Sequence, residues 1–134
     1  MMVAMSDPDA SLHIVKDIEA GASGDPWRWT HQDPTVRILA ATTQNLKLSA
    51  DFALWDGAFK QTGPVELSFF VNDHLLDKVS YAAPGSKHFE KAVPPAWLRV
   101  DQESMLSVHI DKLYTAPQDG KKFGFILTRI GLVP

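Results

Sequence analysis

The chain has 134 residues, the length of a single domain that can bury a core without disulfides or structural metal. It is 45% hydrophobic and 22% charged, which excludes wholesale disorder. The net charge is −3 and the basic residues form no stripe, so nucleic acid is not an expected partner. Cysteine is absent, which excludes disulfides, thiolate nucleophiles and cysteine-based metal sites.

The start of the chain, MMVAMSDPDA, lacks the charged region and long apolar core of a signal peptide. No apolar run reaches the roughly 20 residues that span a bilayer, so no membrane insertion by this segment is expected. The compartment stays open. An extracytoplasmic location is favoured if the chain is cut from a longer membrane protein, and a cytoplasmic one if it is complete. We expect a flexible tail over residues 1–12 and one domain over residues 13–134.

The first half of the chain predicts short strands separated by turns. Its patterns indicate a weak strand over 11–18, a loop over 19–26, an extended segment over 27–31, a turn at 33–34 and strands over 36–41 and 46–55. In the extended segment, Trp27, Trp29 and His31 share one side. Asp56-Gly57 predicts a further turn, with residues 58–59 continuing the strand edge.

The clearest pattern is PVELSFFVNDHLLDKVSY, residues 64–81. Its first half alternates apolar and polar residues, the period of a half-buried strand. Asn72 and Asp73 follow, and both residue types tolerate positive φ, so they suit a tight two-residue turn. A second run follows over residues 75–81. This stretch therefore predicts a β-hairpin at the centre of the fold.

The second half continues in the same way. It predicts a loop over 82–86, a strand over 87–93, a break at Pro94-Pro95, a turn over 101–103, a strand over 105–110, a loop over 114–120 and a last strand over 123–132. Many short alternating strands and no long helical face predict an all-β, antiparallel β-sandwich of jelly-roll type.

Three stretches carry a resemblance to known domains. The runs FFVNDHLLDKV, PGSKHFEKAVPPAWL and DQESMLSVHI resemble carbohydrate-binding and galactose-binding-like jelly-rolls, although Asp73 stands where glycine is commoner in such turns. The entry EAGASGDPWRWT and the exit APQDGKKFGFILTRIGL are similar to accessory sandwich domains attached to bacterial membrane glycosyltransferases. The entry matches through Glu19 and Arg28-Trp29. The exit matches through Asp119, Lys122, Gly124 and Ile130, with lysine at a position that is often arginine.

Aromatic and basic side chains supply the candidate site. The C–H face of a sugar ring packs on an aromatic ring, and its hydroxyls bind polar side chains. The four tryptophans and the similarity above select as carbohydrate-binding candidates Trp27, Arg28, Trp29, Trp55, Tyr114 and Lys122. In this hypothesis the aromatic rings stack on the sugar, and the two basic residues bind hydroxyls or an anionic group.

Other chemistry has little support in the sequence. The five histidines form no HxH or HExxH pair, and the loop acids form no calcium-binding loop, so no metal or other cofactor is predicted. There is no nucleophile elbow, phosphate-binding loop or dinucleotide fingerprint, so an enzyme is not predicted.

The resemblance implies a non-catalytic accessory module that binds or positions a glycan. The alternative is a structural or protein-interaction domain with no small-molecule ligand. In that case the partner would be another protein or a second copy, bound through a sheet edge or a sheet face. Phe70 lies beside Phe69 on the polar side of its strand and favours such a contact.

Overall fold

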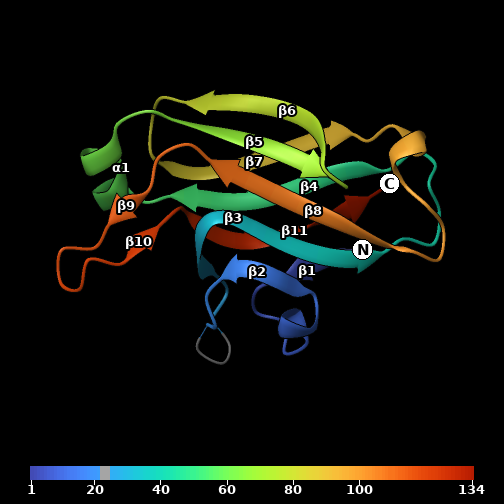
Figure 1. Ribbon diagram of the computed structural model, residues 1–134, viewed down its shortest axis with the longest axis horizontal. Coiled ribbons are helices and arrows are strands. Elements are labelled where there is room, and N and C mark those ends of the chain that lie inside the picture. Colours follow the sequence, from blue (N-terminus) through green and yellow to red (C-terminus); the bar gives the residue numbers. More distant parts are fainter. Residues whose placement is uncertain (22–24) are drawn as a thin grey trace.

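The computed structural model describes residues 1–21 and 25–134 (Figure 1). Residues 22–24, inside the expected loop over 19–26, lie outside the described residues. The elements in chain order are β1 (Met2–Ala4), η1 (Ala10–Leu12), β2 (Ile14–Ile18), β3 (Arg28–Leu39), β4 (Lys47–Leu54), α1 (Asp56–Thr62), β5 (Val65–Val71), β6 (His74–Tyr81), β7 (Gly85–Ala92), η2 (Pro95–Trp97), β8 (Glu103–Ile110), β9 (Tyr114–Thr115), β10 (Lys122–Phe123) and β11 (Ile126–Val133).

Nine of these strands form one antiparallel sheet that curls into a nearly closed barrel. Its path is β6-β5-β8-β3-β11-β4-β7, with β1 paired to β11 and β2 paired to β3. The all-β, antiparallel class is therefore confirmed. The clear two-sheet sandwich is wrong, because β3 pairs with β11 near its start and with β8 near its end and so joins both halves. The jelly-roll type is not confirmed.

β3 is long because it changes partners along its length. Its first two residues pair with β11, whereas Thr35–Leu39 pair with β8. The turn predicted at Asp33-Pro34 is wrong, since the strand runs through both residues. Pro34, which has no N–H to donate, lies between the two pairing zones. Next to Pro34, the backbone N–H of Asp33 donates to the side-chain carboxylate of Asp17 on β2 at 2.9 Å.

The central hairpin is confirmed. β5 and β6 pair around Asn72 and Asp73, whose φ angles of 48° and 67° are those of a tight turn. The apolar faces predicted for three strands also form the core. Their buried residues are Leu46, Leu48, Ala50, Phe52, Leu54, Val65, Leu67, Phe69, Val71, Leu106, Val108 and Ile110.

Residues 1–12, which we expected to be a flexible tail, take part in the fold. β1 pairs with β11, and Val3 and Met5 are buried in the core. Gly131 permits this pairing, because a Cβ there would collide with the backbone of Met1 and Met2. The apolar start of the chain is therefore a strand.

α1 replaces the turn and strand edge that were predicted over residues 56–59. Asp56 and Lys60 form an i,i+4 ion pair at 3.3 Å, and Gly63 ends the helix with a φ of 70°. Seven residues are too few to show a helical period in the sequence. No helix in residues 1–21 or 25–134 has the length and apolar character needed to cross a bilayer.

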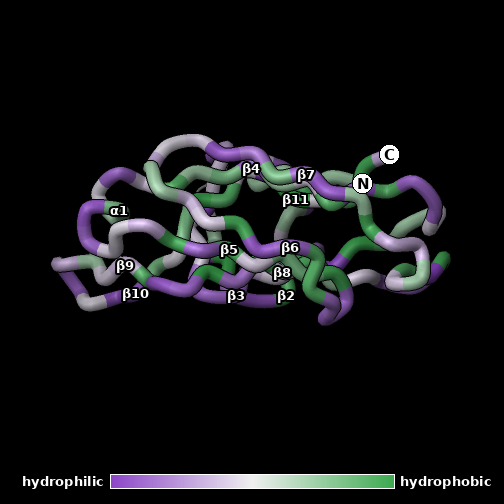
Figure 2. Tube along the Cα trace, turned by 90° about the horizontal axis from the view of Figure 1, so that it is seen from above, coloured by the Kyte–Doolittle hydropathy of each residue, from purple (hydrophilic) through white to green (hydrophobic). Residues whose placement is uncertain are grey.

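The last predicted strand, over 123–132, is interrupted. Its first residue belongs to β10, which pairs with β9 in a separate two-stranded sheet, and β11 begins at Ile126. The β9–β10 hairpin therefore takes in the loop predicted over 114–120. It extends beside α1 at one end of the barrel (Figure 1). Its tip is hydrophilic (Figure 2).

The barrel path ends at β6 and β7, and side chains span the seam between them. Lys91 Nζ lies 3.3 Å from Asp77 Oδ2, and Lys87 Nζ lies 5.8 Å from the centre of the Tyr81 ring. Burial, and then the charge of Asp77, raises the pKa of Tyr81. Charged side chains along free strand edges discourage the addition of a further strand.

A charged network lies across β4, β7 and β11. Asp51 Oδ1 lies 2.6 Å from His88 Nδ1, and Asp51 Oδ2 lies 2.5 Å from Arg129 Nε. His88 Nε2 lies 3.9 Å from Glu90. Partial burial acts to raise the pKa of Asp51, but the hydrogen bonds from His88 and Arg129 outweigh it and hold the pKa below 3.8.

Asp51→Asn tests this network. Because folding lowers the pKa of Asp51, its charge stabilises the fold above pH 3.8, and this stability is lost as pH falls through the lowered pKa. In urea unfolding we expect the variant to lose up to about 1 kcal/mol near neutral pH, with the deficit disappearing in strong acid. The control is Asp9→Asn, an exposed carboxylate on the β1–β2 connection. A deficit that persists in strong acid would contradict the assignment.

Candidate functional site

Five aromatic side chains meet at the end of the barrel that carries α1 and the β9–β10 hairpin. We call Trp29, His31, Trp55, Tyr114 and Phe123 the aromatic cluster. The centre of the Trp29 ring lies 5.8 Å from that of Trp55, 6.3 Å from Tyr114 and 5.3 Å from Phe123. Trp55 and Tyr114 are 5.4 Å apart, as are His31 and Phe123. These separations are favourable for aromatic pairs.

A close backbone approach brings the hairpin to β3. The Thr30 hydroxyl donates to the carbonyl of Phe125 at 3.0 Å and accepts the Phe125 N–H at 3.1 Å. The backbone N–H of Gly124 donates to the backbone carbonyl of Thr30 at 2.7 Å. A Cβ on Gly124 would lie 2.5 Å from the carbonyl oxygen of His31, so this contact requires glycine.

Trp55 reaches the cluster from the residue that precedes α1. Its indole lies against Gly57, where a Cβ would come within 2.6 Å of the ring. Despite this contact, the residue remains 45% exposed. Because Gly57 has no side chain, the indole of Trp55 packs directly on the helix backbone, while much of the Trp55 side chain stays exposed to solvent.

Gln61 links α1 to the hairpin. Its side-chain Nε2 donates to the carbonyl of Thr115 at 3.0 Å, and its Oε1 accepts the N–H of Thr115 at 2.7 Å. The amide thus pairs with β9 as a neighbouring strand would, next to Tyr114. At the hairpin tip, the Asp119 carboxylate accepts the N–H of Lys121 at 3.0 Å, which stabilises the turn.

His31 connects the cluster to the segment before β3. Its Nδ1 donates to the Lys122 carbonyl at 2.8 Å, because a carbonyl can only accept. Its Nε2 lies 3.5 Å from the Glu19 carboxylate, and the N–H of Glu19 donates to the carbonyl of Trp29 at 2.9 Å. Glu19, His31 and the backbone of β10 therefore form one polar chain beside the rings.

The structure brings together three of the sequence candidates, Trp29, Trp55 and Tyr114. Lys122 adjoins the cluster through its backbone, and its side chain is exposed. Arg28 alternates with Trp29 on β3 and packs its side chain beside Gly21.

Trp27, which is 41% exposed, precedes β3 and makes none of the ring contacts of the cluster. Sequence analysis missed Phe123 and His31 as members, and Gly57 and Gln61 as supports. The alternation of Trp29 with His31 was the one available signal for these four residues.

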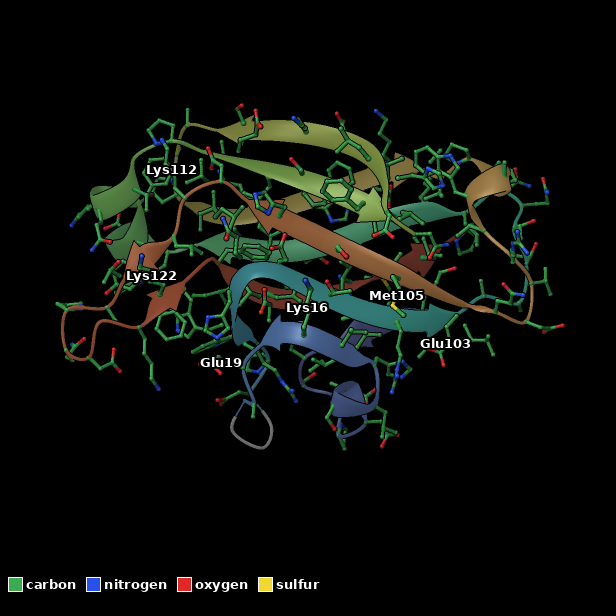
Figure 3. The ribbon with its side chains drawn as sticks, in the orientation of Figure 1. Lys16, Glu19, Glu103, Met105, Lys112 and Lys122 are labelled. Atoms are coloured by element: carbon green, nitrogen blue, oxygen red, sulfur yellow. The ribbon has the colours of Figure 1, made fainter. Side chains whose placement is uncertain are left out.

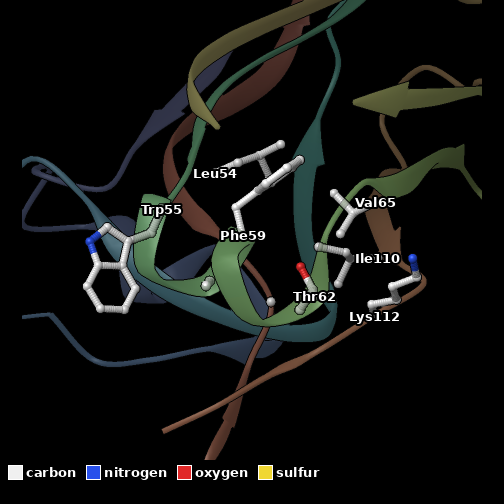
Figure 4. Close-up of a pocket in the computed structure, with 9 residues that line it drawn as sticks. Leu54, Trp55, Phe59, Thr62, Val65, Ile110 and Lys112 are labelled. Carbon is white, nitrogen blue, oxygen red and sulfur yellow. The ribbon is translucent and has the colours of Figure 1, made fainter. Parts of the chain in front are cut away.

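The hollow beside the cluster is small (Figure 4). Trp55, Phe59 and Ile110 are among the residues that line it, and its volume is about 10 Å³. That space holds at most about one water molecule. A larger ligand would therefore have to lie on Trp55 and the half-buried rings beside it.

The described residues contain no group of three or more His, Asp or Glu side chains that could hold a metal ion.

The fourth tryptophan, Trp97, lies on η2 at the opposite end of the barrel and stacks on His74, with the ring centres 4.8 Å apart. Its carbonyl accepts the amide of Asn72 at 2.8 Å, which ties η2 to the central hairpin.

Comparisons with protein-family models, with curated proteins and with solved structures find no match to this chain.

Gly57→Ala tests the packing of the Trp55 indole on Gly57. Alanine alone favours a helix over glycine by about 1 kcal/mol, but here its methyl group would displace the indole. We expect a changed near-ultraviolet circular dichroism spectrum and little or no gain in stability. In the Trp55→Ala background the collision is absent, so the same substitution should add about 1 kcal/mol. An equal gain in both backgrounds would contradict the contact.

Gln61→Ala tests the link to the hairpin. Two hydrogen bonds to Thr115 are lost, each worth about 1 kcal/mol. Amide hydrogen exchange at Thr115 should therefore become faster, while the exchange of β5 and β8 amides changes much less. Lys60→Ala, one residue earlier on α1, is the matched control. Unchanged exchange at Thr115 would show that Gln61 does not hold the hairpin.

Proposed function

We propose that this domain is a non-catalytic carbohydrate-binding module and that the aromatic cluster is its binding surface. The observation that supports this most directly is the meeting of Trp29, Trp55 and Tyr114 at one end of the barrel. Trp55 is 45% exposed within that group. The exposed indole of Trp55 and the half-buried rings beside it provide apolar area for the C–H face of a sugar, at a low entropy cost for their own ordering.

Polar groups beside the rings suit the hydroxyls of such a ligand. Lys122 is exposed next to Phe123, and the Glu19 carboxylate lies beside His31. The two offer donors and acceptors respectively. Of the two basic candidates, we favour Lys122 over Arg28, because Arg28 projects from the opposite side of β3 to Trp29 and packs against Gly21.

The small hollow makes the proposed binding a surface interaction. A cavity of about 10 Å³ cannot enclose a sugar ring, so the ligand would keep much of its surface in water. Such contact suits positioning of a glycan chain. This agrees with the accessory role that the resemblance to sandwich domains of bacterial membrane glycosyltransferases implies. We keep that role, and the relationship to jelly-roll domains, as parts of the proposal.

The test is intrinsic tryptophan fluorescence titrated with a panel of monosaccharides and glycans. We expect a saturable change in the wild type that is lost in Trp55→Ala. Trp27→Ala is the matched control, since Trp27 is similarly exposed, at 41% against 45%, but lies outside the cluster. A flat wild-type response across the panel, or equal loss in both folded variants, would reject the aromatic cluster as a sugar site.

Protein association is a second candidate function. It is favoured by a different observation, the exposed apolar side chains along the outside of β2, β3, β6 and β8.

A further inference from the structure

One side of the barrel exposes large apolar side chains. We call the outward side of β6, β5, β8, β3 and β2 the β8 face, after its middle strand. The core residues of β3 and β8, such as Ile38 and Leu106, point inward, and their sequence neighbours point outward. The exposed large apolar residues of these strands are Val15, Leu39, Leu75 and Met105.

A groove runs across this face. Its volume is about 430 Å³, and its apolar walls include Val15, Phe70 and Met105. Thr35 and Ser107 also line the groove, and their hydroxyl oxygens lie 3.0 Å apart. Strand register explains the groove, because these two small residues face each other on β3 and β8 while larger ones flank them.

Three charged residues line the groove. Asp33 on β3 is paired with His109, whose Nδ1 lies 2.6 Å from its carboxylate, and the other two lie on opposite sides. Lys16 is on β2, at one side, and Asp73 is in the β5–β6 turn, at the other. Figure 3 shows Lys16, Met105 and Glu103 along β2 and β8 on the side facing the viewer. Glu103 lies 3.7 Å from Arg37, so this pair adds little net charge to the face.

We propose that the β8 face binds a second copy of this chain, in a twofold dimer whose axis runs along the strands. Such an axis exchanges the two sides of the groove. It therefore brings Lys16 of each copy toward Asp73 of the other, and packs the two Met105 side chains near the axis. Under this rotation, a surface that carries apolar residues together with both signs of charge is complementary to itself.

The pairing of the strands excludes one other kind of contact at this face. β5, β8 and β3 are each paired on both sides, so an extended peptide cannot add to their backbones. Contact must therefore be made through side chains, face against face. The aromatic cluster lies at the α1 end of the barrel, so this inference does not depend on the proposed sugar site.

Sedimentation velocity over about 1 to 500 µM protein tests the dimer, since transient interfaces of modest size commonly dissociate within this range. We expect the wild type to shift from monomer to dimer. Met105→Glu should weaken the dimer at least about tenfold, because it places two like charges at the axis. Val100→Glu is the matched control, because Val100 is a similarly exposed apolar residue in the loop before β8.

A charge exchange tests the symmetry. Lys16→Glu and Asp73→Lys should each weaken the dimer, and the double variant should restore it, since it reverses both charges of the same contact. Circular dichroism verifies that each variant is folded. A wild type that stays monomeric at every concentration would overturn the proposal. So would a dimer that tolerates Met105→Glu, or charge variants that the double substitution does not rescue.

Discussion

The structure depends on the close approach of β3 to the segment that leads into β11. The Thr30 hydroxyl and the backbone of Phe125 exchange two hydrogen bonds, and Gly124 leaves room for the carbonyl of His31. This contact lies where β3 leaves β11 and continues toward β8. It joins the two halves of the sheet, and the barrel shape follows from that junction.

The aromatic cluster is a consequence of the same contact. Trp29 and His31 flank Thr30 on β3, and Phe123 precedes Gly124, so the junction sets their rings against one another. The remaining rings arrive by separate routes. Trp55 is seated on the backbone at Gly57, while Tyr114 is held next to the strand-like pairing of Gln61 with β9. Small residues and one amide side chain therefore determine the geometry.

The barrel offers two kinds of surface with different physical character. Its α1 end presents clustered aromatic rings without an enclosed cavity, which suits shallow contact with a hydroxyl-rich chain. The β8 face presents dispersed apolar side chains with both signs of charge, which suits contact with a protein surface. The two surfaces share no residue, so a ligand bound to one surface does not block the other.

The sequence by itself determined the features that depend on neighbouring residues. Alternation placed Leu48, Phe52 and Leu67 in the core, because adjacent side chains of any strand point to opposite faces. Asn72-Asp73 specified the tight turn, because both residues accept positive φ. The same alternation put Trp29 and His31 on one side of the chain, but it put Trp27 there as well, and Trp27 does not join the cluster.

Only the tertiary structure decided which distant elements meet. Two sheets or one barrel are equally compatible with alternating strands, and the choice rests on the two partners of β3. A seven-residue helix is too short to show a period, so α1 and the seat it provides for Trp55 were missed. Trp27 and Trp55 were both predicted as carbohydrate-binding residues, yet only Trp55 joins the cluster. The reason is physical: ring contacts depend on backbone approach across the barrel, which local residue patterns do not encode.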